Sequence, residues 1–130
     1  MAKTILITGA SSGLGAGMAR EFAAKGYNLA LCARRLERLE TLKQELQSQH
    51  SVQISIKVLD VTHYDDVFTV FKAFQQEFGT IDRIIVNAGV GDGRRIGKGN
   101  FEVNRATAET NFISALAQCE AAVEIFRAQN

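Results

Sequence analysis

The sequence contains no proline and only two cysteines, and its charges nearly cancel. Cys32 and Cys119 lie far apart and neither belongs to a CxxC pair, so the chain offers no pattern for a metal site or for redox chemistry. Both thiols are expected to be buried, in a reducing compartment. A formal net charge of +1 at pH 7 gives no case for nucleic acid or a membrane surface as a partner. A charged ligand would therefore have to be recognised locally.

Long apolar segments are also missing. No charge-free stretch approaches the ~18 residues that are needed to span a bilayer. The three apolar residues "ILI" near the N-terminus are too few for a signal peptide. We therefore expect a cytoplasmic protein. Repeats, low-complexity tracts and linkers are absent, so we expect one domain, residues 1–130.

Four short apolar runs have the length and composition of β-strands. The first, second and fourth are almost continuously apolar, as expected for parallel strands that are covered on both faces. The third alternates apolar and polar residues, which indicates a half-exposed strand at an edge of the sheet. The four runs are residues 4–8, 28–33, 52–59 and 83–88.

Helical periodicity separates these runs. Strict alternation of strand and helix predicts right-handed crossovers and a doubly wound α/β fold with a parallel sheet. Gly26 and Gly79 stand where the first and third helices should end, in keeping with the preference for glycine after a helix. The expected apolar stripes are Leu14, Met18 and Phe22; Leu36, Leu39, Leu42 and Leu46; and Val67, Phe71, Phe74 and Phe78.

The segment from residue 101 to residue 129 is helical in pattern but has an unusually wide apolar face. A surface helix with a single neighbour rarely needs so broad a stripe, so something besides the sheet is expected to cover it. Before it, residues 89–100 contain five glycines and are expected to form a flexible loop. One apolar stripe is Phe112, Leu116, Cys119, Val123 and Phe126, and the adjoining one is Ile113, Ala117, Ala121 and Ile125.

The stretch "TGASSGLG", residues 8–15, joins the first strand to the first helix. Free backbone N–H groups and the positive end of the helix dipole converge at such a turn, which makes it an anion site. Glycine permits both the tight turn and the close approach of a pyrophosphate. The spacing differs from the G-x-G-x-x-G fingerprint and lacks the Gly-Lys-Ser/Thr ending of a P-loop. A purely structural turn is the alternative.

Three motifs on this strand–helix frame resemble those of the short-chain dehydrogenases/reductases. They are "TGASSGLG" at 8–15, "LDV" at 59–61 and "NAG" at 87–89, and the resemblance runs along the whole chain. It implies a Rossmann-type sheet and a bound dinucleotide. Asp60 would accept a hydrogen bond from the adenine amino group beside a backbone contact from Val61; as an alternative, Asp60 is a loop or helix-start carboxylate. The remaining contacts would come from Gly9, Ser11, Ser12, Gly13, Leu14 and Gly15 around the pyrophosphate, and from Asn87, Ala88 and Gly89 beside the second ribose.

The second strand indicates which dinucleotide would bind. In Rossmann-type sites an acidic residue at its end takes the ribose 2′-OH, whereas an arginine accommodates a 2′-phosphate. Here Ala33 occupies the acidic position, and Arg34 and Arg35 follow it. We therefore expect NADP(H). The competing interpretation places these arginines, with Arg38, on a solvated helix face paired with Glu37 and Glu40.

The acid that protonates a carbonyl during reduction is not apparent in this sequence. The family uses a tyrosine with a lysine four residues later, but Tyr27 and Tyr64 are followed at that spacing by Leu31 and Phe68. Asn111 matches the helix asparagine that holds a water in the family's proton relay, although a polar surface residue is the alternative. Ser114 lies on the wrong element to be the catalytic serine.

These observations predict the NADP(H)-binding N-terminal half of a reductase. The Rossmann-type sheet would be truncated after the fourth strand and its following helix, and the chain alone would bind nucleotide without turnover. The wide apolar face of the last helix predicts self-association into an oligomer. The alternatives are a non-catalytic dinucleotide-binding or interaction module, and a scaffold that binds no nucleotide.

Overall fold

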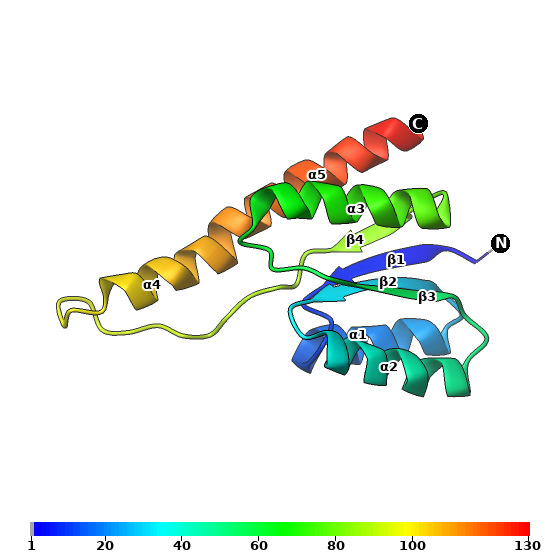
Figure 1. Ribbon diagram of the computed structural model, residues 1–130, viewed down its shortest axis with the longest axis horizontal. Helices are drawn as coiled ribbons and strands as arrows, with labels where there is room; N and C mark the ends of the chain where they lie inside the picture. The colour runs from blue at the N-terminus through cyan, green and yellow to red at the C-terminus, as the bar shows by residue number, and fades with distance from the viewer. Residues whose placement is uncertain (1) are drawn as a thin grey trace.

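The computed structural model describes residues 2–130 as a four-stranded parallel sheet with helices on both faces (Figure 1). The strand order is β3-β2-β1-β4, which confirms the predicted doubly wound α/β fold. The elements are β1 (Thr4–Thr8), α1 (Gly13–Ala24), β2 (Asn28–Ala33), α2 (Leu36–Gln49), β3 (Ile54–Val58), α3 (Tyr64–Phe78), β4 (Arg83–Ile85), α4 (Phe101–Ala108), the π-helix η1 (Glu109–Ile113) and α5 (Ser114–Gln129).

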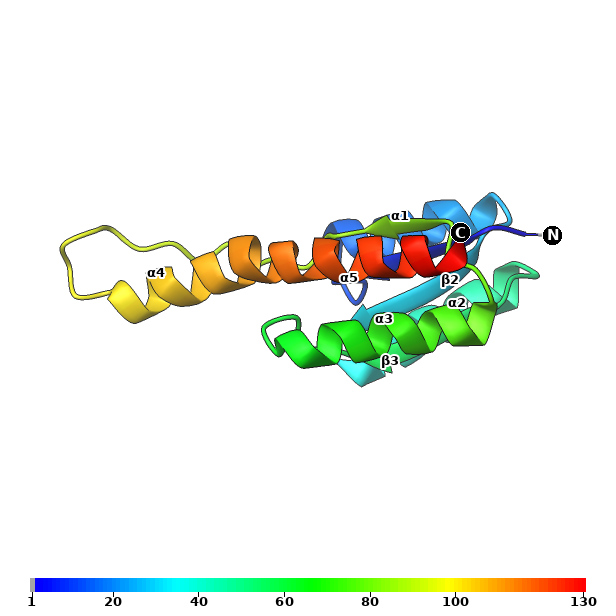
Figure 2. The same ribbon diagram turned by 90° about the horizontal axis from the view of Figure 1, so that it is seen from above.

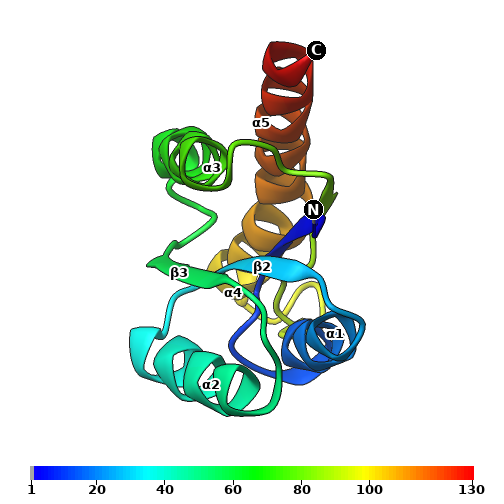
Figure 3. The same ribbon diagram turned by 90° about the vertical axis from the view of Figure 1, so that its right-hand side faces the viewer.

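The sheet separates two apolar cores. Successive strand residues point to opposite faces, so Ile5 and Ile7 pack with α1 and α2, whereas Leu6 and Cys32 pack with α3 and α5. Figure 3 shows the sheet end-on, with α1 and α2 on one side and α3 and α5 on the other. Coverage on both faces explains why the first two strands are almost continuously apolar.

The third strand lies at one edge of the sheet, as its alternating pattern predicts. It pairs only with β2, and Val58 at its end is 52% exposed. Ile54 points into the core and is buried. The strand begins at Ile54 and not at residue 52.

The predicted apolar stripe of the first helix is wrong at Leu14. This side chain is 80% exposed, and the buried residues of α1 are Gly15, Ala16, Ala19 and Ala23. Small residues let the helix lie close to the sheet and occupy its fully buried positions, while Met18 and Phe22 of the predicted stripe are partly buried against the same core. Leu36 is likewise 41% exposed at the start of α2, although the other predicted residues of that stripe, Leu39, Leu42 and Leu46, are buried.

The third helix follows its predicted stripe. Val67, Phe71 and Phe74 are fully buried, and they share a core with Ala121 and Ile125 of α5. The helix ends at Gly79, which has a φ of 82°, so the predicted glycine stop is confirmed. The core shared by α3 and α5 fixes α5 over the same face of the sheet as α3.

The predicted long C-terminal helix is present as α4, η1 and α5 in succession, with η1 inserted as one π-helical turn. Figures 1 and 2 show α4 extending beyond the sheet, and neither α4 nor η1 contains a buried residue. We refer to α4 and η1, residues 101–113, as the arm. Of the helices described for residues 2–130, none combines the length and apolarity required to cross a membrane.

The outer face of the last helix is open to solvent. Phe112, Leu116 and Val123 are 69%, 55% and 45% exposed. Cys119 is also exposed, so the expectation that both thiols are buried is wrong for this residue. Cys32 is buried as expected, and burial raises the pKa of its thiol to about 12. Of the apolar stripe predicted from 112 to 126, the residues up to Val123 therefore face away from the core, whereas Phe126 is partly buried against it.

Two phenylalanines, one buried in α3 and one exposed on the arm, should affect the stability of the protein very differently when they are replaced. Phe71→Ala should lower the free energy of unfolding by about 3–5 kcal/mol, because it leaves a cavity in the core. Phe101→Ala is the control, since Phe101 is 69% exposed, and it should change stability by less than about 0.5 kcal/mol. Urea denaturation measures both values; losses of equal size would contradict the packing described.

Candidate functional site

A pocket of about 880 Å³ opens at the carboxyl ends of the strands. It lies where the chain, after building β2 and β3 on one side of β1, returns to place β4 on the other side. Ligands of open α/β sheets bind at such a switch point. The pocket contains twelve of the predicted cofactor residues: Gly9, Ser11, Ser12, Gly13, Leu14, Arg34, Arg35, Asp60, Val61, Asn87, Ala88 and Gly89.

The glycines of the loop leave backbone exposed in this pocket, beside the side chains of Ser11, Ser12 and Leu14. Gly9 and Gly13 have φ values of 63° and 54°, in the left-handed region that favours glycine. Ser12 is the N-cap of α1, and its side chain makes no capping hydrogen bond. The N–H groups of the first turn therefore receive no side-chain cap and lie at the positive end of the helix dipole, as an anion site requires.

Gly15 contributes to the loop from behind the pocket wall. It is buried and does not line the pocket. A Cβ here would lie 2.8 Å from Nδ2 of Asn87 and closer still to the carbonyl oxygen of Gly9. Gly15 is therefore required for the close packing of α1 against the loop, whereas the resemblance had implied a contact with the ligand.

Asn87 and Thr8 join the ends of the two central strands. The hydroxyl of the buried Thr8 accepts hydrogen bonds from the backbone N–H groups of Asn87 and Ala88, both at 3.0 Å. The side-chain amide of Asn87 donates to the carbonyl oxygens of Thr8 and Gly9, both at 3.2 Å. These bonds fix the glycine loop against the segment after β4. Sequence reasoning missed Thr8, whose only signal was its place before Gly9.

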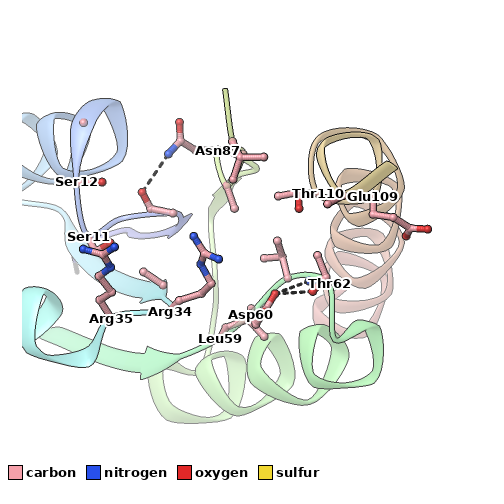
Figure 4. A pocket seen from close by; sticks show the side chains of 18 of the residues that line it. Ser11, Ser12, Arg34, Arg35, Leu59, Asp60, Thr62, Asn87, Glu109 and Thr110 are labelled. Atoms are coloured by element: carbon pink, nitrogen blue, oxygen red, sulfur yellow. Dashed lines mark hydrogen bonds between the residues drawn. The ribbon is translucent and has the colours of Figure 1, made fainter. Parts of the chain in front are cut away.

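The arginines after β2 form the basic wall of the pocket. Arg34 and Arg35 extend from the end of β2 into the pocket, as Figure 4 shows, and Arg38 on α2 lines the same wall. All three are exposed. None of the ion pairs found among residues 2–130 involves them, so the alternative pairing with Glu37 and Glu40 is not observed. Their positive charge is available to an anion in the pocket.

Asp60 serves both as a pocket residue and as a loop carboxylate. Its Oδ1 accepts hydrogen bonds from the backbone N–H of Thr62 at 3.0 Å and from the Thr62 hydroxyl at 2.7 Å. Partial burial raises the pKa of Asp60, but the bonds from Thr62 and the positive charges of His63 and Arg34 outweigh it, so the pKa lies below its ordinary value. The carboxylate is thus charged and held in place by its own loop.

Asn111 lies outside the pocket wall, in the π-helix η1. Its Oδ1 accepts from the backbone N–H of Val90, and its Nδ2 donates to the carbonyl oxygen of the same residue, both at 2.7 Å. The side chain therefore anchors the loop that follows β4. π-helical turns are frequent at functional sites. Asn111 is also exposed, so it fits the alternative of a polar surface residue, with its side chain paired to Val90.

The outer wall of the pocket comes from residues that sequence reasoning did not place there. The hydroxyl of Tyr64, at the start of α3, donates to Oε2 of Glu109 in η1. This bond and the negative charge of Glu109 raise the pKa of Tyr64 above its ordinary value. No sequence pattern relates two residues so far apart. The outer wall comprises Thr62, Tyr64, Glu102, Arg105, Ala106, Glu109 and Thr110.

Two glycines of α1 provide a matched test of the close packing behind the loop. Gly15→Ala should lower the free energy of unfolding by about 1–3 kcal/mol or more, because the new methyl group meets backbone and Asn87. Gly17→Ala, where a Cβ meets no atom within 4 Å, should raise it by up to about 1 kcal/mol. Chemical denaturation measures both, and a tolerated Gly15→Ala would contradict the packing.

The amino-acid sequence is similar to those of known oxidoreductases. An uncharacterised oxidoreductase of Mycobacterium tuberculosis is 54% identical over 123 residues, which cover 94% of this chain and 49% of the relative. An NADP-dependent 3-hydroxy acid dehydrogenase of Schizosaccharomyces pombe is 35% identical over 130 residues, covering 98% and 50%. The chain thus spans about half the length of these curated relatives.

A solved structure has the same fold over nearly the whole chain. The alcohol dehydrogenase of the archaeon Thermococcus sibiricus, complexed with 5-hydroxy-NADP, superposes with a TM-score of 0.93 at 32% identity, covering 99% of this chain and 55% of that one. The short chain dehydrogenase family model matches residues 3–130. With the parallel sheet, the glycine loop and the Thr8–Asn87 junction, this match establishes that the chain belongs to the short-chain dehydrogenase/reductase family.

Proposed function

We propose that this chain binds NADP(H) as the cofactor-binding part of an oxidoreductase. The observation that carries the proposal is one pocket with uncapped backbone amides on one side and three arginines on another. A dinucleotide with a 2′-phosphate has two anionic groups that match them: the diphosphate for the amides and the 2′-phosphate for the arginines. The relative from Schizosaccharomyces pombe and the structure from Thermococcus sibiricus, both named for NADP, support it.

The residues present fit such a ligand. Gly9 and Gly13 have no side chain where a pyrophosphate would approach, and a Cβ at Gly9 would lie 2.8 Å from Cα of Ala88. In the proposal, Ser11, Ser12 and Gly13 surround the diphosphate, Asp60 and Val61 hold the adenine, and Asn87, Ala88 and Gly89 border the second ribose. Gly15 contributes by permitting the packing behind the loop.

Selection of the phosphorylated cofactor is assigned to Arg34 and Arg35. Ala33, at the end of β2, offers no carboxylate that would repel a 2′-phosphate. Each arginine can donate charge-assisted hydrogen bonds to phosphate. Because both side chains are exposed, solvent weakens each contact, but two together correspond to more than about tenfold in affinity.

The activity proposed for the whole protein is hydride transfer between the nicotinamide and a carbonyl or alcohol, chemistry that the cofactor supplies when bound. We propose that residues 1–130 alone do not turn over. The hydroxyl of Tyr64 is engaged by Glu109, and Phe68 stands where a lysine would be needed. Asn111 is proposed to assist proton transfer; because its side-chain amide holds Val90, its backbone would supply the water contact.

The exposed face of the last helix is proposed to mediate self-association. Phe112, Leu116, Cys119 and Val123 form an apolar stripe on one side of η1 and α5, which we call the outer stripe. Burial of such a stripe against a second copy would remove apolar area from water. The free, exposed thiol of Cys119 suits a reducing compartment, so the proposal includes a cytoplasmic location.

Cofactor choice is tested at Arg34. Arg34→Asp should weaken NADPH binding by more than about tenfold and NADH binding much less, because it replaces the phosphate partner with a repelling charge. NADPH and NADH fluorescence titrations measure both. Lys72→Asp on α3 makes the same change in net charge outside this pocket and should alter neither affinity. Equal losses for the two cofactors in Arg34→Asp would refute the assignment.

Self-association is tested at Leu116. Wild-type protein should form an oligomer whose proportion increases with concentration, and Leu116→Lys should shift it to monomer by placing a charge in the outer stripe. Ile96→Lys is the control, since Ile96 is 91% exposed but lies outside the stripe. Sedimentation velocity measures the distribution. A monomeric wild type, or equal behaviour of the two variants, would contradict the proposal.

A further inference from the structure

The arm forms much of the pocket wall but has almost no apolar packing to hold it. Neither α4 nor η1 contains a buried residue. Yet Glu102, Arg105, Ala106, Glu109 and Thr110 all line the pocket. Beyond its helical continuation into α5, the wall is therefore held by specific polar contacts.

Two of those contacts tie η1 to opposite sides of the pocket. Asn111 pairs with the backbone of Val90, after β4. Two residues earlier, Glu109 accepts a hydrogen bond from Tyr64, the first residue of α3. Among residues 2–130, the bond from Tyr64 is the one hydrogen bond found between α3 and the arm. Tyr64 and Glu109 are both half-buried, and both line the pocket.

The Tyr64 side of this link adjoins the adenosine part of the proposed site. Asp60 lies four residues before Tyr64 and is braced by Thr62 between them. Arg34, assigned to the 2′-phosphate, follows β2, which is the sheet neighbour of β3. In Figure 4, Thr62 and Asp60 lie between Arg34 and the wall that carries Thr110 and Glu109. The hydrogen bond thus crosses the rim beside the segment that would hold the adenine.

We propose that Tyr64 and Glu109 are positioning residues whose hydrogen bond holds the arm against the adenosine side of the pocket and thereby strengthens binding of the adenosine half of the cofactor. The inference rests on the proposed function, because the ligand is the NADP(H) assigned there. Neither side chain needs to touch the cofactor. Their effect is to keep the wall formed by η1 in place, which lowers the ordering cost of binding.

The test is titration of the full 130-residue chain with 2′,5′-ADP and with NADPH. Tyr64→Phe removes the donor and Glu109→Ala removes the acceptor. Each variant should lower the binding affinity for both ligands by about two- to fivefold, the range for one polar contact at an exposed rim. The double variant should lose no more than either single variant, since both break the same bond. Tyr27→Phe is the matched control, because Tyr27 packs edge-on against Phe22 and does not line the pocket.

Two further measurements separate positioning from a general loss of structure. Glu109→Gln keeps an acceptor oxygen and should bind both ligands as the wild type does. Ultraviolet titration should show that Tyr64 ionises at lower pH in Glu109→Ala, because the bond that favours the phenol is gone. Unchanged ligand affinities in Tyr64→Phe and Glu109→Ala, or additive losses in the double variant, would overturn the inference while leaving cofactor binding intact. Failure of the wild type to bind NADPH would instead overturn the proposed function, and the inference with it.

Discussion

The site depends on the close approach of three backbone segments: the end of β1, the first turn of α1 and the segment after β4. Gly9 and Gly15 leave no room for a Cβ at this junction, and Thr8 and Asn87 join the segments with four hydrogen bonds. As a result, the amides at the start of α1 have a fixed direction. The proposed binding of a diphosphate follows from this arrangement, since the groups that would hold it are part of the main chain.

The other walls of the pocket differ in how well their segments are packed against the rest of the protein. The end of β2, which carries Arg34, is anchored by cores on both faces of the sheet. Asp60 follows β3 and lies between Leu59 and Val61, which are both buried in the core beside α3. The arm supplies the outer wall with no buried residue of its own and is attached by polar side chains. Discrimination between cofactors is therefore assigned to the well-packed side, whereas the arm is the side whose position can be altered by one hydrogen bond.

Local patterns predicted the parallel sheet, the alternation of strands and helices, the glycine loop and the arginines after β2. The resemblance to the short-chain dehydrogenases/reductases implied the other predicted pocket residues, at 60–61 and 87–89. The local patterns failed at Leu14, since the buried face of α1 is made of small residues that a search for bulky side chains overlooks. They failed at Cys119 because periodicity identifies an apolar stripe without saying whether this chain covers it. The Tyr64–Glu109 bond depends on how the arm returns across the pocket, which no local pattern contains.

The central claim is that backbone amides of the glycine loop hold the diphosphate while arginines after β2 hold the 2′-phosphate. A crystal structure of the chain with NADP⁺ tests it most directly. The account predicts hydrogen bonds from the N–H groups of residues 9–15 to the diphosphate, and contact between the Arg34 guanidinium and the 2′-phosphate. A nucleotide bound elsewhere, or bound with Arg34 turned away from the 2′-phosphate, would contradict it.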